Sequence, residues 1–179
     1  MLLDENMKKK LFNFFINMPK ASLLLLVSLF CVGCDQTTKF TAQRVLEPDS
    51  VTKLLGGTIR IQLAQNEGSF LGLGSSLPAE WKLWIFVILV AIILVILLIY
   101  YFHFEAGNSL STLSLSLIIS GGFSNLIDRI IHDGIVIDFF NIGIGNLRTG
   151  ILNIADVSIT SGIVLLLVSF FLKKNQEYF

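Results

Sequence analysis

Four long apolar segments alternate with more polar segments along this chain of 179 residues. The pattern predicts membrane-spanning helices over residues 21–41, 84–104, 109–127 and 155–172. The second of these segments runs without a Lys, Arg, Asp or Glu residue. Because a helix needs about 20 apolar residues to cross a hydrocarbon core of roughly 30 Å, this segment is long enough to span a bilayer. The chain is therefore expected to be a polytopic membrane protein.

The polar region between the first two helices, residues 43–78, predicts a small β element. Residues 51–55 and 58–63 are rich in β-branched side chains and are separated by a Gly-Gly pair, which is typical of a hairpin. A single hairpin is too small to be stable alone, so we expect it to lie at the membrane surface against the helices. The expected fold class is an all-α polytopic membrane protein of four transmembrane helices, with an extracytoplasmic β element between helices 1 and 2. Residues 1–179 then form one membrane domain, and about 25 residues of loop connect the third and fourth helices.

Interface residues and charge indicate how the helices are oriented. Trp81 and Trp84 stand at the start of the second helix, where tryptophan commonly marks the membrane interface. An even number of spans puts both termini on one side. The first helix usually dominates orientation, and it is preceded by a group of lysines, namely Lys8, Lys9, Lys10 and Lys20. We therefore expect both termini in the cytoplasm.

Composition narrows the class of protein further. The chain is 54% hydrophobic and only 15% charged, with a mean hydropathy of +0.77, whereas soluble domains usually carry about a quarter charged residues. Lys plus Arg balance Asp plus Glu at 13 each, so net charge predicts no nucleic-acid or other polyanionic partner. With only Cys31 and Cys34, the chain is not a disulfide-stapled secreted domain.

The two cysteines open a second interpretation. Residues 31–34 follow lysines and an apolar run, as the cleavage site of a lipoprotein signal peptide does. Cys34 would then be lipidated, and the chain would be a membrane lipoprotein. Three further spans would remain after cleavage and would make a lipid anchor unnecessary. We therefore interpret both cysteines as small helix residues.

Four aspartates stand at or near the ends of the predicted helices, and they are the candidates for chemistry: Asp35, Asp128, Asp138 and Asp156. A charged side chain in a membrane segment costs on the order of 3 kcal/mol, so such residues are functional candidates by default. A structural ion pair is the competing interpretation. Asp35 has a partner in Lys39 one turn later, and Asp128 has one in Arg129 or on another helix.

Asp138 and Asp156 differ from the other two aspartates, because each lies in an apolar stretch with no basic residue close in sequence. Two carboxylates brought together cannot both ionise easily, so they share a proton. An aspartyl protease needs that state: one carboxylate takes a proton from water while the other, protonated, polarises the peptide carbonyl. Asn66, Asn125 and Asn153 can donate amide hydrogen bonds to such a pair.

Other chemistries lack their motifs. The sequence has no HExxH motif, and His103 and His132 are too far apart to suggest a zinc site, so no metal or cofactor is predicted. The Gly-x-Gly at residues 143–145 is followed by Asn146 rather than by the aspartate of presenilin-type proteases. There is no phosphate-binding loop. The alternative function is a small proton-coupled transporter or channel component that uses the same aspartates.

Four sequence blocks resemble the lipoprotein signal peptidase (signal peptidase II) family. They are residues 35–39 (DQTTK), 66–72 (NEGSFLG), 121–129 (GGFSNLIDR), and 136–139 (VIDF) together with 153–156 (NIAD). They occur in the family's order, each near the end of a predicted helix, and the resemblance covers residues from about 20 to 172. The sequence departs from the family pattern at Leu71, Ser124 and Leu152, and by one extra residue near Asp133, which bears on the shape of the pocket.

The resemblance implies an aspartyl endopeptidase of the bacterial inner membrane. Its substrates would be lipid-modified prolipoproteins, cleaved before the diacylglyceryl-modified cysteine, and membrane lipid would be its other partner. The family's catalytic pair falls on Asp138 and Asp156. Its supporting residues fall on Asp35, Lys39, Asn66, Gly68, Gly121, Asn125, Asp128, Arg129, Asn153 and Ala155.

Overall fold

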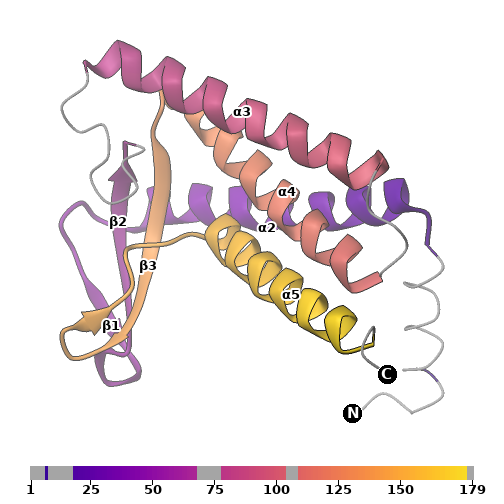
Figure 1. The fold of residues 1–179 in the computed structure, drawn as a ribbon. Coiled ribbons are helices and arrows are strands. Elements are labelled where there is room, and N and C mark those ends of the chain that lie inside the picture. The colour runs from indigo at the N-terminus through magenta and orange to yellow at the C-terminus, as the bar shows by residue number, and fades with distance from the viewer. Residues whose placement is uncertain (1–6, 8–17, 68–77, 104–108, 177–179) are drawn as a thin grey trace.

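Four long helices dominate the structure, a computed structural model that describes residues 7, 18–67, 78–103 and 109–176. They are α2 (Lys20–Val45), α3 (Ala79–His103), α4 (Ser109–Ile131) and α5 (Ile154–Gln176). All four contain a stretch that is long and apolar enough to cross a membrane. The axes of the helices are roughly aligned, while the chain direction differs between helices, and the sheet lies at one end of them (Figure 1). The chain is thus built as a membrane protein with four spanning helices.

The helices extend beyond several of the predicted boundaries. Helix α2 continues to Val45, and α3 begins at Ala79 rather than at residue 84. Helix α4 ends at Ile131 instead of residue 127, so Asp128 and Arg129 lie in its last turn rather than after it. Hydropathy alone marked only the apolar part of each helix, and the helices continue into the more polar residues beside it.

The sheet has four antiparallel strands in the order β1-β2-β3-β4. Its strands are β1 (Thr52–Leu54), β2 (Ile59–Asn66), β3 (Val136–Ile144) and β4 (Leu147–Arg148), with a 3-10 turn η1 (Leu55–Gly57) after β1. The pairing of β1 with β2 confirms the predicted hairpin. The all-α expectation is wrong in detail, because the connection between α4 and α5 is not a loop: it supplies β3 and β4. The sheet therefore joins two connections that are far apart in sequence.

The pairing of β2 with β3 contains an irregularity. Ile61 pairs with Phe140, and Ala64 pairs with Asp138. In β3, one residue lies between Asp138 and Phe140, whereas in β2 two residues lie between Ile61 and Ala64. Strand β2 therefore carries one extra residue, as in a β-bulge.

Arg148 ties the two halves of the sheet together at the end far from the helices. Its guanidinium donates to the backbone carbonyls of Gly57 (3.0 Å) and Thr58 (3.2 Å) in the hairpin. The same group donates to the carbonyl of Gly143 (3.2 Å) and to the side chain of Asn141. It also donates to the backbone carbonyl of Asn141 (3.3 Å), so one side chain satisfies five acceptors from both connections.

The helices pack closely through small residues of α4 and α5. A Cβ atom added at Gly121 would lie 2.5 Å from the carbonyl oxygen of Ala155, and one at Gly162 would lie 2.7 Å from that of Ser114. Hydroxyl pairs also join helices: Ser28 and Ser120 lie 2.8 Å apart. Close approach through small residues, with hydroxyls bonded across helices, is typical of helix packing in membranes.

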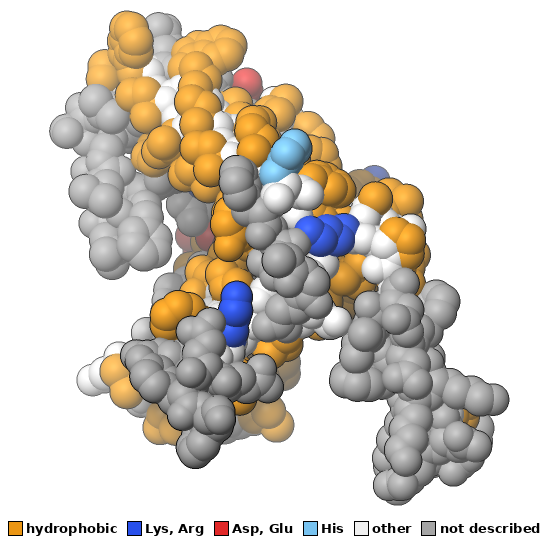
Figure 2. All heavy atoms as spheres, turned by 45° about the vertical axis from the view of Figure 1, so that its right-hand side comes forward, with side chains coloured by type: hydrophobic (Ala, Val, Ile, Leu, Met, Phe, Trp, Pro, Cys, Tyr) orange, Lys and Arg blue, Asp and Glu red, His pale blue; other side chains and the backbone are white. Residues whose placement is uncertain are grey.

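Large hydrophobic side chains cover the outside of the helices. In α2, Leu25, Leu29 and Phe30 are exposed, and α5 exposes Leu167 and Phe170 in the same way. Figure 2 shows hydrophobic side chains over much of the described surface on one face, with isolated basic groups among them. Such surfaces suit contact with lipid rather than with water.

Candidate active site

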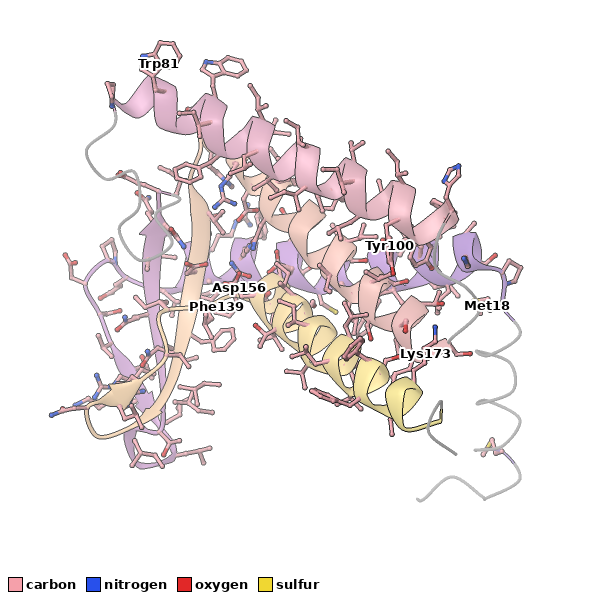
Figure 3. The ribbon with its side chains drawn as sticks, viewed as in Figure 1. Met18, Trp81, Tyr100, Phe139, Asp156 and Lys173 are labelled. Atoms are coloured by element: carbon pink, nitrogen blue, oxygen red, sulfur yellow. The ribbon has the colours of Figure 1, made fainter. Side chains whose placement is uncertain are left out.

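The start of α5 positions Asp156. The amide of Asp156 donates to Asn153 Oδ1 at 2.8 Å, and the amide of Asn153 donates back to Asp156 Oδ2 at 3.1 Å. This reciprocal arrangement is a capping box, which satisfies backbone groups that a helix start leaves unpaired. Figure 3 shows Asp156 at the sheet end of α5, with Lys173 at the far end. The local sequence Asn-Ile-Ala-Asp therefore both begins the helix and fixes the carboxylate.

Strand β3 brings Asp138 to the same place. Asp138 is 2% exposed, and its Oδ1 accepts a hydrogen bond from Asn153 Nδ2 at 2.6 Å. Its Oδ2 accepts one from Asn66 Nδ2 at 3.0 Å, across from β2. Asn153 thus contacts both aspartates, through its side-chain amide to Asp138 and through its backbone amide to Asp156.

The third amide comes from α4. Asn125 Nδ2 donates to Asp156 Oδ1 at 3.0 Å, and Asn125 Oδ1 accepts from Asn153 Nδ2 at 3.2 Å. The three asparagines named from the sequence therefore surround the two carboxylates. Every carboxylate oxygen of Asp138 and Asp156 accepts one hydrogen bond from an amide nitrogen.

Burial and the negative charge of Asp156 raise the pKa of the Asp138 carboxyl from its ordinary value near 3.8 to about 6. Hydrogen bonds from Asn66 and Asn153 act in the opposite direction, as does the positive charge of Lys39, because all of them favour the charged form. The effect of Asp156 shows that the two carboxylates are electrostatically coupled. A pair of this kind shares one proton below about pH 6.

A buried ion network centred on Lys39 lies beside the pair of Asp138 and Asp156 and contacts it through Asn125. Lys39, only 3% exposed, lies 2.6 Å from Asp35 Oδ2 and 2.8 Å from Asp128 Oδ2. The expected pair between Asp35 and Lys39 is confirmed, and Asp128 pairs with Lys39 of another helix. The third contact of the ammonium is Asn125 Oδ1 at 2.9 Å. Lys39 therefore links two aspartates that are not part of the pair to an asparagine that is.

The same network fixes the elements that carry the pair. Asp35 Oδ1 accepts from the backbone amide of Ala155 at 2.8 Å, beside Asp156 in the first turn of α5. Asp128 Oδ2 accepts from the backbone amide of Ile137 at 3.1 Å, beside Asp138 in β3. Each supporting carboxylate thus holds the backbone next to one member of the pair.

Two residues of this network were not among the predicted site residues. Gln36 Nε2 donates to Asp128 Oδ1 at 2.7 Å and to Ser124 Oγ at 3.1 Å. Ser124, which was noted only as a departure from the family pattern, donates to Asp35 Oδ2 at 2.7 Å. Both are adjacent in sequence to predicted site residues and lie within the blocks 35–39 and 121–129, which are the signals that the sequence offered.

The remaining predicted site residues divide into three groups. Gly121 and Ala155 lie at the contact between α4 and α5, where Ala155 is fully buried. Arg129 lies close enough to Asp138 and Asp156 for its charge to act on both, and its Nε is buried without a hydrogen-bond partner among the described residues. Gly68 lies outside the described residues.

These features define a class: a multi-pass membrane protein with two amide-bound carboxylates at one end of its helices, held by a buried ion network. Residues 27–172 match the family model of signal peptidase (SPase) II. This chain belongs to the signal peptidase II family.

Several relatives agree with this assignment. The lipoprotein signal peptidase of Thermodesulfovibrio yellowstonii is 35% identical over 140 residues, which cover 78% of this chain and 88% of that protein. The lipoprotein signal peptidase of Caldicellulosiruptor bescii is 35% identical over 154 residues, covering 86% and 92%. A solved bacterial membrane enzyme, at 27% identity, covers 82% of this chain and 91% of its own with a TM-score of 0.73.

Proposed function

We propose that this protein is an aspartic endopeptidase that removes signal peptides from prolipoproteins by cutting before the diacylglyceryl-modified cysteine. Membership of the signal peptidase II family supports the removal of signal peptides. The observation that carries the aspartic mechanism is the coupled pair of Asp138 and Asp156, whose four oxygens all accept amide hydrogen bonds. The transporter alternative has no support from this family.

The environments of the two carboxylates suggest their separate roles. Asp156 lies in the first turn of α5, where the positive end of the helix dipole favours a negative charge. The pKa of Asp138 is raised to about 6 by burial first and by Asp156 second, so Asp138 retains a proton more readily. We assign Asp156 as the general base and Asp138 as the general acid.

In this mechanism Asp156 removes a proton from a water molecule, whose oxygen attacks the scissile carbonyl carbon. Asp138 donates its proton to the carbonyl oxygen as the tetrahedral intermediate forms. Collapse of the intermediate breaks the C–N bond: the proton held by Asp156 passes to the leaving amine, and a hydroxyl proton of the intermediate returns to Asp138. The amides of Asn66, Asn125 and Asn153 keep both carboxylates in place during these transfers, which is the preorganisation that general acid–base catalysis requires.

The proposed placement puts both termini in the cytoplasm and the sheet on the outer side of the inner membrane, with the chain acting as one membrane domain. Trp81 and Trp84 support an interface at the sheet end of α3. They are 65% and 61% exposed, and Figure 3 shows Trp81 at that end of the helix. A substrate anchored in the outer leaflet by its diacylglyceryl group would then present its peptide bond near the pair.

The test is cleavage of a lipidated prolipoprotein by the purified full-length protein, followed as a change in substrate size. Asp138→Asn and Asp156→Asn should each lower turnover by about 10³-fold or more, as for other groups that act as a unit. Asp133→Asn is the matched control, because Asp133 is exposed and its φ of 52° is a conformation that asparagine tolerates. Turnover at the parent rate by Asp138→Asn would exclude the mechanism.

The same assay tests the position of the cut. A substrate whose cysteine carries no diacylglyceryl group should remain uncleaved. Cleavage of lipidated and unlipidated substrates at equal rates would show that recognition does not depend on the lipid.

A further inference from the structure

The outer part of the sheet, made of residues 52–54, 59–61, 140–144 and 147–148, has one apolar and one polar face. Successive residues of a strand point to opposite faces, and directly paired residues share a face. The pairs Leu54 with Ile59, Ile59 with Ile142, and Ile144 with Leu147 therefore lie on one side. We call this side the apolar face. Apart from Thr52, which pairs with Ile61, it is made of Leu54, Ile59, Ile61, Phe140, Ile142, Ile144 and Leu147.

The opposite side is basic and polar. It carries Lys53 and Arg60, which pair across β1 and β2, and Asn141, which pairs with Arg60 across β2 and β3. Arg148, which pairs with Gly143, lies on this side as well and bonds to the Asn141 side chain. The outer part of the sheet is therefore amphipathic, and no second layer of described residues covers its apolar face.

That outer part is strongly exposed. Ile144 and Leu147 expose 80% and 86% of their surface, and Leu54 and Ile142 expose 45% and 43%. A contiguous exposed apolar surface of this kind marks a site of interaction with protein or membrane.

The apolar face points in the direction in which the helices run. Strand β3 keeps strict alternation, so Asp138 shares the face of Ile142 and Ile144, and Asp138 bonds to Asn153 directly before α5. Figure 1 shows the strands crossing one end of the helices and continuing past them. The part of the apolar face that extends beyond the helices therefore faces the space beside α5.

The wall of that space is a lipid-facing surface. Helix α5 is one of the four candidate spans, and its exposed hydrophobic residues begin at Val157, directly after Asp156. A lipid leaflet in contact with Val157 would fill the corner between α5 and the sheet. The polar side of the sheet then faces water, and basic side chains such as Lys53 on the edge strand can reach phosphate groups.

We propose that the apolar face of the sheet lies on the membrane, with Leu54, Ile142, Ile144 and Leu147 inserted among the lipid headgroups and upper acyl chains. An amphipathic element that lies in the plane of the interface binds in this way. The proposal rests on the placement of the four helices across the membrane and not on the assignment of the catalytic pair. It predicts that the sheet touches lipid whether or not a substrate is bound.

Single tryptophans report which face meets lipid. In a background with Trp81→Phe and Trp84→Phe, the probes are Leu54→Trp and Ile144→Trp, with Leu147→Trp as a further probe. Lys53→Trp is the matched control, since Lys53 is exposed and adjacent to Leu54 but lies on the opposite face. Each full-length variant is reconstituted in vesicles of phosphatidylcholine and phosphatidylglycerol, with and without bromine on the acyl chains near the headgroup, and compared with its background protein.

We expect Leu54→Trp and Ile144→Trp to emit at shorter wavelength than Lys53→Trp and to be quenched by the brominated lipids without any substrate present. Equal emission and equal quenching of the two faces would overturn the proposal. It would also be overturned if the probes on the apolar face were not quenched by the brominated lipids and changed their emission only when a lipidated peptide was added. The face would then bind substrate. Loss of peptidase activity in Asp138→Asn leaves this measurement unaffected, so the two proposals fail independently.

Discussion

Lys39 Nζ donates to Asn125 Oδ1 at 2.9 Å, and this contact sets which way the Asn125 amide faces. An ammonium has only donors, so the oxygen of the amide must point toward Lys39. The NH₂ group then points to Asp156 Oδ1, at 3.0 Å. Lys39 makes no hydrogen bond to Asp138 or Asp156, yet it orients the Asn125 amide so that Asp156 faces a donor and not a repelling acceptor.

Lys39→Met should destabilise the protein strongly. The variant leaves Asp35 and Asp128 buried together without their shared cation, and breaking a buried ion pair in this way costs about 3–5 kcal/mol. Thermal unfolding in detergent micelles measures the loss. Lys53→Met, at an exposed position on β1, is the control and should change stability by less than about 0.5 kcal/mol. Equal melting temperatures for the two variants would show that the network contributes nothing.

The pH dependence of kcat/KM should report the proton on Asp138. Because its carboxyl has a pKa of about 6 and must be protonated to act as the acid, activity should fall as pH rises through about 6. Asn66 donates to Asp138 Oδ2 and so lowers this pKa. Asn66→Ala should therefore move the falling limb to higher pH, whatever its effect on the maximum. A limb that moved to lower pH would contradict the assigned direction.

The same raised pKa affects stability with a defined sign. The folded state holds the Asp138 proton up to about pH 6, whereas an unfolded aspartate loses it near pH 3.9. The contribution of Asp138 to stability is therefore complete below about pH 3.9 and is lost as pH rises through about 6. Asp138→Asn removes this dependence, so the difference in melting temperature between parent and variant should change over that pH window.

Asp128→Asn should lower stability and reduce activity only in part. Asp128 accepts from Gln36, Lys39 and the amide of Ile137, and an asparagine keeps its size but loses one acceptor. Leaving one buried donor unpaired costs about 1–3 kcal/mol. Activity and melting temperature are measured together with those of Asp138→Asn. If Asp128→Asn were inactive but fully stable, and Asp138→Asn merely slow, the catalytic role would move to Asp128.

Gly121→Ala should disturb the site by packing alone. The new methyl would lie 2.5 Å from the carbonyl oxygen of Ala155, so α5 must shift at the turn that carries Asp156. Overpacking of this kind costs about 1–3 kcal/mol, and cleavage should slow. Gly33→Ala is the matched helical control, because nothing lies within 4 Å of its added Cβ. Comparable losses in both variants would show that the effect is not local to the contact.

The sequence predicted the parts of this structure that depend on local pattern. Hydropathy located the helices, and the Gly-Gly pair between β-branched runs located the hairpin of β1 and β2. Strand β3 was missed because its stability comes from pairing with β2, which is about 70 residues away in sequence, and β4 was missed with it because β4 pairs with β3. An apolar stretch of this length is ambiguous until its partner is known.

The candidate site shows the same division. The two unpaired aspartates and the three asparagines were recognisable by residue type and setting. The sequence predicted only one of the contacts of Lys39. Its contact with Asp35 spans one helical turn, whereas its contacts with Asn125 and Asp128 cross between helices. Spacing along one helix indicates the first kind of contact and carries no information about the second.

The bulge in β2 determines which side chain of that strand reaches Asp138. If β2 alternated strictly from Ile61, Gln65 would share the face of Asp138 and Asn66 would lie on the opposite face. The extra residue before Ala64 reverses this assignment, and Asn66 meets Asp138. At its present length, a β2 strand without the bulge would therefore turn Asn66 away from Asp138, although no side chain of the site would have been altered. Deleting one residue between Ile61 and Ala64 would remove the bulge and keep Asn66 on the face of Asp138.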